Sequence, residues 1–311
     1  MDDPELFKDA GYLLEEPLEA DEWGELYRGL YVPHDREVLL RAFPQALARE
    51  PGAWELMQAE IQAWARLEHP GVLQALDWGE VPGRCYVATE MPRGEPLAAL
   101  LAEDIGVDGA DELFASLLVS VEAARQWGVL HLGLGLSNIW VDGGGVVEVG
   151  EFGFWYVARE FPGLEVDAGH YRAPEQLHGE RTSAATDVYS LGLIYVALRG
   201  GMGASLDAAR GSGLPPGLAD RRAVLERCLE RQPLVRYRSA RELADNLGLR
   251  PEEWLYEEYR DCPICRLKEE IQRGASARPR TMPAAAWVKY VWAAIVALTV
   301  VTALVWWLAL R

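Results

Sequence analysis

The spacing of apolar residues in positions 1–90 is typical of a β-rich region with a single helix. Short apolar runs at 38–43, 72–78 and 84–90 predict strands, whereas 54–67 repeats its apolar residues at helical intervals. One amphipathic helix among several strands is therefore the arrangement expected for this part of the chain.

Residues 91–250 are dominated by helical periodicity. Long helices are predicted over 111–127 and 186–199, and the run of glycines within 141–146 predicts a hairpin turn. A last helix over 239–247 begins at a serine followed three residues on by a glutamate, which is the capping-box pattern. The change of period between the two regions predicts two lobes.

One uncharged stretch of twenty residues, 291–310, is long enough to cross the hydrocarbon core of a membrane. A buried core helix is the alternative, but such helices rarely run so far without a polar face. Four Lys/Arg residues lie between 273 and 289, and only Arg311 follows the stretch. The positive-inside rule therefore predicts a single-pass membrane protein with the bulk of the chain in the cytoplasm. The opening residues are acidic and do not predict a signal peptide.

Charge narrows the choice of partners. Half of the 311 residues are hydrophobic, enough for a sizeable core, and the net charge is −18. Residues 262–290 carry six Lys/Arg against two Glu, which leaves residues 1–261 near −23. Such a surface repels phosphate and argues against nucleic acid as a partner. It either suits a basic protein partner or serves solubility.

The four cysteines, Cys85, Cys228, Cys262 and Cys265, are too scattered for a disulfide framework and fit a reducing compartment. Cys262 and Cys265 form a CPIC pair, which is half of a tetrahedral zinc site. Completing that site needs chain folding back, a second chain or a partner. A zinc half-site, a redox pair and unliganded reduced thiols stay open as interpretations.

Eight motifs follow one another along the chain: VLLR, LEHPGVLQALDWGE, YVATEMPRGEPL, HLGLGLSNIWV, EFG, YRAPE, DVYSLGLIYVAL and PLVRYRSARELADNL. Each alone is a weak signal. Together, over about residues 12–248, their order and spacing resemble the protein kinase family, in particular the bacterial serine/threonine kinases with a membrane helix.

The resemblance implies an α+β, bilobal protein kinase-like fold. A small β-rich N-lobe is expected over about 12–90 and a larger helical C-lobe over about 91–248. An N-terminal segment, 1–11, comes before them. A juxtamembrane segment with the CPIC pair and a basic linker, 249–290, comes after them and leads to the transmembrane helix, 291–310.

The resemblance also implies a nucleotide pocket, whose phosphate loop is altered here. The family pattern G-x-G-x-x-G-x-V aligns with residues 19–26, where Glu19 and Asp21 replace two glycines. Backbone amides cannot approach phosphates closely there, and the carboxylates add repulsion. The pocket positions by resemblance are Gly24, Leu26, Arg41, Thr89, Glu90 and Met91, with Thr89 as gatekeeper.

Most residues that carry phosphoryl transfer in the family are replaced. Arg41 stands where the family has its strand lysine and is expected to pair with Glu60, the alternative being two unrelated surface side chains. Gly133 stands in place of the aspartate base and Gly135 in place of the loop lysine. A glycine accepts no proton, and losing a positioned base typically lowers the rate by ~10²–10⁴-fold.

The two metal-binding positions are partly kept. Asn138 is present, either as a metal ligand or as a turn asparagine that caps local backbone. Glu151 replaces the magnesium-binding aspartate, and its longer side chain moves a bound cation without excluding it. Binding of ATP and magnesium is therefore predicted to be weak or absent, and no cofactor is required.

Residues whose family role is structural are retained. By resemblance, His131 is a packing residue rather than a catalyst, and Asp187 anchors the loop that contains His131. Glu175 and Arg236 are expected to form an ion pair.

The joint loss of chemistry beside a retained frame predicts a pseudokinase that acts as a scaffold or regulatory binding module for a protein partner at the membrane. Residues 151–175 contain no Ser or Thr, so Tyr156 and Tyr171 are the hydroxyls left there for phosphorylation. Two alternatives stay open: an atypical ATP-dependent serine/threonine kinase with a rebuilt site, and a nucleotide-binding sensor without turnover. The sequence does not indicate an oligomeric state.

Overall fold

The structure is a computed structural model that describes residues 4–21, 23–102, 109–161, 164 and 169–250. The predictions for the rest of the chain, namely the CPIC pair, the basic linker and the transmembrane helix, lie outside the described residues. None of the described helices is both long and apolar enough to cross a membrane.

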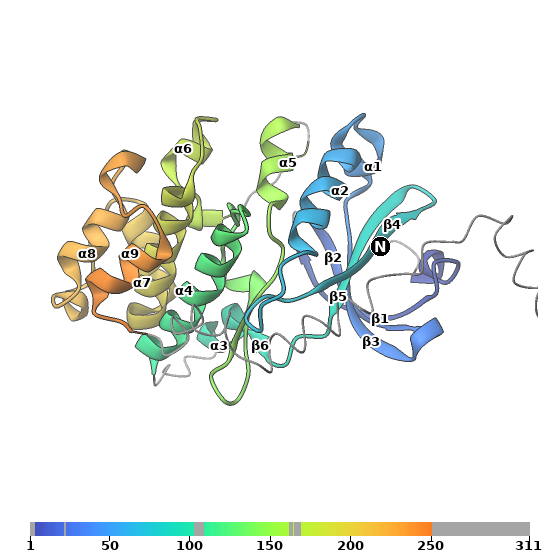
Figure 1. Ribbon diagram of the computed structural model, residues 1–311, viewed down its shortest axis with the longest axis horizontal. Helices are drawn as coiled ribbons and strands as arrows, with labels where there is room; N and C mark the ends of the chain where they lie inside the picture. The colour runs from blue at the N-terminus through green and yellow to red at the C-terminus, as the bar shows by residue number, and fades with distance from the viewer. Residues whose placement is uncertain (1–3, 22, 103–108, 162–163, 165–168, 251–311) are drawn as a thin grey trace, which may run out of the picture. The chain divides into compact units, whose positions relative to one another are not determined.

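The N-lobe is built on an antiparallel five-stranded sheet with the strand order β1-β2-β3-β5-β4 (Figure 1). Its strands are β1 (Tyr12–Asp21), β2 (Gly24–Tyr31), β3 (Arg36–Ala42), β4 (Ala75–Val81) and β5 (Arg84–Glu90). The last three confirm predicted strands. β4 begins three residues later than predicted, because the Leu73 N–H donates to the Val149 carbonyl of the other lobe at 2.8 Å.

The segment before β1 packs on this sheet. It contains a short helix, η1 (Pro4–Phe7), and the Phe7 side chain is buried. The Phe7 ring meets the Tyr86 ring edge-on, with 5.9 Å between the centroids. The folded lobe therefore includes residues that the sequence placed ahead of it.

Two helices, α1 (Gln45–Arg49) and α2 (Ala53–Trp64), connect β3 to β4. α2 confirms the predicted amphipathic helix, and its apolar stripe, which includes Met57 and Ile61, is buried. The helix ends three residues earlier than predicted. Its last residue, Trp64, donates its indole N–H to the Leu73 carbonyl at 2.8 Å, which ties the end of α2 to the start of the next segment.

The C-lobe is mainly helical. Its α-helices are α3 (Leu97–Ala102), α4 (Ala110–Gln126), α5 (Phe154–Glu160), α6 (Pro174–Leu177), α7 (Ala184–Ala209), α8 (Arg222–Cys228) and α9 (Ala240–Leu247). The short helices of the chain after η1 are η2 (Val32–His34), η3 (Leu136–Asn138), η4 (Gly169–Tyr171), η5 (Pro216–Leu218) and η6 (Pro233–Val235). A three-stranded sheet contains β6 (Glu95–Pro96), β7 (Ile139–Val141) and β8 (Val147–Val149).

Local polar contacts place the predicted turn and the last helix. The Asp142 carboxylate accepts the N–H groups of Gly144 and Val146, which closes the β7–β8 hairpin. The Ser239 hydroxyl accepts the Glu242 N–H at 3.1 Å, as a helix cap does. The Glu242 carboxylate, however, accepts the Arg238 N–H, so the predicted capping box is only half formed.

A column of aromatic rings joins the two lobes. The His131 ring lies 4.6 Å from the Phe152 ring, and the Phe152 ring lies 6.5 Å from that of Trp64. Phe154 adds a second contact to Trp64 at 6.0 Å. These residues are all buried, so the column fixes the segment around residue 152 against α2.

Candidate functional site

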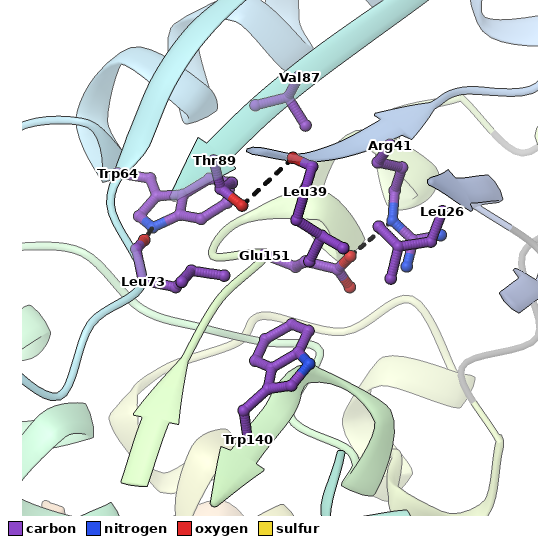
Figure 2. Close-up of a pocket in the computed structure, with 9 residues that line it drawn as sticks. All are labelled: Leu26, Leu39, Arg41, Trp64, Leu73, Val87, Thr89, Trp140 and Glu151. Carbon is purple, nitrogen blue, oxygen red and sulfur yellow. Dashed lines mark hydrogen bonds and ion pairs between the residues drawn. The ribbon is translucent and has the colours of Figure 1, made fainter. Parts of the chain in front are cut away.

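The candidate site is a small cavity between the five-stranded sheet and the loop that follows β8. Figure 2 shows the side chains that line it, drawn from both lobes. They are Leu26, Leu39, Arg41, Trp64, Leu73, Val87, Thr89, Trp140 and Glu151. Apolar side chains form most of the wall, and Arg41 and Glu151 are its charged members.

Arg41 is the centre of the charged end of the cavity. Its side chain is only 4% exposed, its Nε lies 2.5 Å from Glu151 Oε1, and its Nη1 lies 2.7 Å from Asp21 Oδ1. Asp21 is the last residue of β1, and Glu151 is in the loop after β8. One guanidinium therefore links the tip of the β1–β2 hairpin to the C-lobe, because its planar fork offers donors in several directions.

The electrostatics of this group follow from its burial. Burial raises the pKa of Glu151 to about 7, the nearby Asp21 carboxylate adds to the rise, and Arg41 acts in the opposite direction. Burial acts to lower the pKa of Arg41, but Glu151 and Asp21 outweigh it and the pKa is raised. The arginine therefore keeps its charge and serves as the counter-ion of both carboxylates.

The ion pair predicted between Arg41 and Glu60 is absent from the described residues, where the ion pairs of Arg41 are with Asp21 and Glu151. Glu60 packs against Gly153 instead: a Cβ placed on that glycine would lie 2.5 Å from Glu60 Oε2. α5 begins directly after Gly153 and packs on α2. The backbone around Gly153 therefore packs against Glu60, and Glu151 forms the ion pair with the Arg41 guanidinium.

Trp23 and Gly24, where β2 begins, pack closely against neighbouring elements. Trp23 is buried, its ring lies 5.4 Å from that of Phe154 in α5, and its backbone N–H donates to Asp21 Oδ1 at 2.7 Å. Gly24 has a φ of +104°, and a Cβ there would lie 2.0 Å from the Ala42 carbonyl oxygen. This retained glycine therefore permits the close approach of β3, whatever its role toward a ligand.

The apolar end of the cavity is filled by Trp140, which lies in β7 two residues after Asn138. Trp140 is buried and packs with Leu26, Leu39 and Leu73. The volume open to the centre of a water molecule is about 10 Å³, which is about enough for one water. The residues present therefore do not fit a nucleotide in this arrangement. Trp140 was not predicted as a pocket residue, although its position two residues after Asn138 could have indicated that it lines the cavity.

The other predicted pocket residues are Leu26, Thr89, Glu90 and Met91. Leu26 and Thr89 line the cavity, and the Thr89 hydroxyl donates to the carbonyl of Glu90 at 2.9 Å. The Glu90 side chain points elsewhere and forms an exposed ion pair with Arg36 at 2.6 Å. Met91 packs beside the cavity, against the cluster that contains Trp140. The sequence therefore predicted Leu26, Arg41 and Thr89 as lining residues, but it predicted neither Trp140 nor the ion pair between Arg41 and Glu151.

The loop over residues 131–138 presents backbone where the family has charged side chains. A Cβ built on Gly133 meets Trp155 Cβ at 3.8 Å and His131 Nδ1 at 3.9 Å as its nearest atoms, so no described carboxylate lies within 4 Å of it. A Cβ built on Gly135 meets only Tyr171, at 3.9 Å. Among the described residues, both positions have room for a side chain, so packing within the described part of the chain does not explain the glycines.

Asn138 braces this loop. Its Nδ2 donates to the Gly133 carbonyl at 2.8 Å, and its Oδ1 accepts the Gly135 N–H at 3.0 Å. The side chain is buried, and both ends of its amide are used. This geometry is that of the asparagine that caps local backbone, one of the two interpretations drawn from the sequence.

Asp187 and His131 hold the start of the same loop. The Asp187 carboxylate accepts the N–H groups of His131 and Leu132 at 3.0 and 2.7 Å. The His131 ring is hydrogen-bonded to the Gly150 carbonyl at 2.8 Å. Burial raises the pKa of Asp187 to about 6 and lowers that of His131 to about 4. The loop therefore stands on a buried polar frame.

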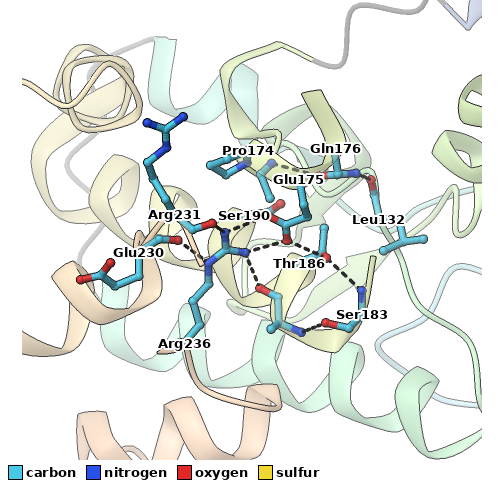
Figure 3. A network of polar contacts seen from close by, with 12 residues as sticks. Leu132, Pro174, Glu175, Gln176, Ser183, Thr186, Ser190, Glu230, Arg231 and Arg236 are labelled. Carbon is cyan, nitrogen blue, oxygen red and sulfur yellow. Dashed lines mark hydrogen bonds and ion pairs between the residues drawn. The ribbon is translucent and has the colours of Figure 1, made fainter. Parts of the chain in front are cut away.

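The predicted ion pair between Glu175 and Arg236 is present and buried (Figure 3). Arg236 contacts both carboxylate oxygens, each at 2.8 Å. Thr186 donates a further hydrogen bond to Glu175, and the carbonyls of Ala185 and Glu230 accept from Arg236. Every polar group of the pair finds a partner, which is the condition for such a pair to be tolerated in a core.

The two tyrosines singled out between residues 151 and 175 differ in exposure. Tyr171 is buried, and burial raises its pKa to about 12. Tyr156 is half-buried in α5, where the Arg159 guanidinium lies 4.5 Å from its ring centroid. Among the described residues, no three His, Cys, Asp or Glu side chains are grouped as a metal site would require.

Residues 22–203, more than half of the chain, match the protein kinase domain family. The chain is 28% identical over 257 residues to the serine/threonine-protein kinase PknA of Mycobacterium tuberculosis, covering 75% of this chain and 60% of PknA. It is 28% identical over 176 residues to the serine/threonine-protein kinase PksC of Streptomyces coelicolor, covering 51% of this chain and 32% of PksC.

Among solved structures, the PknI kinase domain of Mycobacterium tuberculosis superposes with a TM-score of 0.63 at 24% identity, over 77% of this chain and 96% of that domain. The two lobes and the cleft between sheet and helices are those of a protein kinase domain. This chain belongs to the protein kinase family.

Proposed function

We propose that this chain is a pseudokinase, a kinase-fold protein that binds a protein partner as a scaffold or regulatory module and transfers no phosphate. In this proposal the span 291–310 anchors the chain in a membrane, and the bulk of the chain lies in the cytoplasm. The membrane part rests on the sequence, through the uncharged twenty residues and the basic residues before them.

The main support for the proposal is that side chains of the chain itself occupy the cleft. Trp140 fills the apolar end, and Arg41 holds Asp21 and Glu151 together at the charged end. Gly133 also offers no side chain as an acceptor for a substrate proton, and no described carboxylate lies within 4 Å of its Cβ position. The proposal therefore rests on three features of the described residues: the small cavity, the engagement of Glu151 by Arg41, and the glycine at position 133.

Nucleotide binding is tested by the thermal unfolding of the full chain in bilayer discs with millimolar ATP and magnesium. A ligand at 100 times its Kd stabilises a protein by about 2.7 kcal/mol, so a binder would shift the transition clearly. We expect no shift. A kinase relative that binds ATP, prepared in the same discs, serves as the positive control.

The atypical-kinase alternative has one point in its favour, since Asn138 and the Glu151 carboxylate are both retained near the cleft. It is tested by incubating the full chain with labelled ATP, magnesium and generic protein acceptors. Phosphate transfer that is lost in both Glu151→Gln and Asn138→Ala would overturn the pseudokinase proposal. An ATP-induced thermal shift without transfer would instead favour the nucleotide sensor.

Anchoring has its own test. The full chain expressed in a bacterial host should stay in the membrane fraction after alkaline carbonate washing and be released by detergent. A chain that ends at residue 290 should be released by the wash. Release of the full chain by carbonate would contradict the span without bearing on the cleft.

A further inference from the structure

The described domain is acidic except for its last thirty residues. Residues 1–220 contain 37 Asp/Glu against 14 Lys/Arg, whereas residues 221–250 contain eight arginines against four acidic residues. The basic part folds as α8, η6 and α9, drawn in orange at the end of the domain away from β1 and β2 (Figure 1). Arg236 and Arg221 pair with Glu175 and Asp111 from outside this segment, so the positive charge left at this end is smaller than the count and includes the exposed Arg231 and Arg238.

An apolar tip lies in the middle of this basic part. η6 places Leu234 at 98% exposure, with Val235 beside it at 45%. The residue that follows the tip, Arg236, is buried in the ion pair with Glu175, which fixes the position of the tip. The Arg227 Nε also donates to the Val235 carbonyl at 3.0 Å. The exposed leucine is thus presented by a fixed turn.

Two arginines flank the tip without an acidic partner. The exposed Arg231 and Arg238 form no ion pair with any described residue, whereas Arg222 and Arg227 pair with Glu226 and Glu242. Figure 3 shows the Arg231 side chain extending away from the Glu175–Arg236 network. Guanidinium groups of this kind bind phosphate by paired hydrogen bonds.

We propose that the tip formed by Leu234 and Val235, with Arg231 and Arg238, docks the domain on a bilayer that contains anionic phospholipids. Leu234 enters the boundary between headgroups and acyl chains, and the two arginines bind lipid phosphates. A bilayer suits a convex tip because it receives an apolar side chain without a preformed groove. In this orientation the acidic β1–β2 hairpin, at the other end of the domain, lies away from the anionic lipid surface.

This contact rests on the anchoring part of the proposed function. A single leucine and two arginines make a weak membrane contact in a free protein. In an anchored chain the contact is intramolecular, and its effective concentration is on the order of millimolar. The forty residues between Arg250 and the span reach at most roughly 140 Å when fully extended, so the tether permits the contact.

The test is hydrogen exchange of the full chain in lipid discs of phosphatidylcholine, either alone or mixed with phosphatidylglycerol. We expect amide exchange over residues 229–238 to be several-fold slower in the anionic discs than in the neutral discs. Raising the salt concentration should reduce the difference, because the arginine–phosphate attraction is screened. Leu234→Glu and the double variant Arg231→Glu/Arg238→Glu should abolish it.

Matched controls come from the acidic end of the domain. Leu18→Glu and Arg28→Glu make the same chemical changes at exposed positions of β1 and β2 and should leave the protection intact. Unchanged melting temperatures of all four variants exclude unfolding as the cause.

Equal exchange in the two kinds of disc, with the chain retained in both, overturns this inference and leaves the anchoring standing. If neither kind of disc retains the chain, both the docking inference and the proposed membrane anchoring are overturned. Protection by soluble poly-glutamate as strong as that by anionic lipid would assign the face to an acidic protein and also overturn the inference.

Discussion

At the residue scale, Arg41 shows how one substitution changes the use of a site. An ammonium group is a point charge, whereas a guanidinium presents several donors in one plane. In this cleft two of those donors reach two carboxylates from different lobes. The side chain therefore acts as an internal counter-ion in the place where the family binds a ligand.

Removing this counter-ion should be costly. Arg41→Met leaves Asp21 and Glu151 close together without a positive charge, and we expect the free energy of unfolding to fall by about 3–5 kcal/mol. The control is Arg36→Met, which breaks the exposed pair with Glu90 and should cost at most about 1 kcal/mol. Urea denaturation of the two variants measures the difference. Equal losses would show that the cleft pair is no more important than a surface pair.

His131 makes a prediction about pH. Burial lowers its pKa to about 4 from an ordinary value of 6.5, so the folded chain holds the neutral ring. Between these two pH values the unfolded chain binds the extra proton, and the stability present above pH 6.5 is lost as the pH falls through 4. His131→Phe keeps a ring beside Phe152 and removes this titration.

We therefore expect the wild type to lose on the order of 3 kcal/mol more stability than His131→Phe between pH 6.5 and 4. Asp187 also titrates in this range, but it is present in both proteins and its contribution cancels in the comparison. Denaturation curves across the pH range provide the measurement, and the exposed His34 supplies a control substitution. Parallel curves for wild type and His131→Phe would contradict the assignment.

At the scale of elements, the β1–β2 hairpin is shaped by its contact with β3 and α5. Trp23 packs on Phe154, and Gly24 lies against the backbone of Ala42. The hairpin that carries phosphate-binding backbone in the family is here a packed part of the lobe interface.

A pair of glycine variants separates steric contact from backbone strain. Gly24 and Gly83 both have positive φ, but a Cβ at Gly24 would lie 2.0 Å from the Ala42 carbonyl, and one at Gly83 meets nothing within 4 Å. Both alanine variants carry the strain of the left-handed backbone. We expect Gly24→Ala to lose about 1–3 kcal/mol more in a denaturation experiment, because it also overpacks the sheet. Equal losses would mean that the hairpin moves away from β3 freely.

At the scale of the whole molecule, the structural frame and the chemical site have separated. The Glu175–Arg236 pair and the Asp187 contacts hold the C-lobe in the arrangement of the family. None of these groups faces the cavity. Such a frame can be retained for its stability and its surface while the cleft changes, because the two sets of contacts share no side chain.

This separation predicts the outcome of a simple rescue. Gly133→Asp restores a carboxylate at a position with room for it, since the nearest atom to its Cβ is 3.8 Å away. We expect the variant to fold with an unchanged melting temperature and to transfer no phosphate from ATP to a generic acceptor, because Trp140 and Arg41 still fill the cleft. Robust transfer by this single variant would show that the cleft opens readily, and the proposed function would fail.

By itself the sequence determined the parts of this protein that depend on local pattern and motif order. The strands near residues 38 and 84, the helices beginning near 54 and 111, and the absence of a base at Gly133 were readable from it. The Glu175–Arg236 pair was readable as well, because both residues stand in strong motifs. These features need only periodicity, spacing and the identity of one residue at a time.

Only the tertiary structure decided which partners meet in the cleft. Arg41 has Glu60 nineteen positions away and Glu151 a hundred and ten away, and it pairs with the more distant one. Trp23 and Trp140 fill space whose existence depends on how two lobes pack. Competition among carboxylates for one cation, and among side chains for one cavity, is settled by distances in three dimensions, which spacing along a chain does not contain.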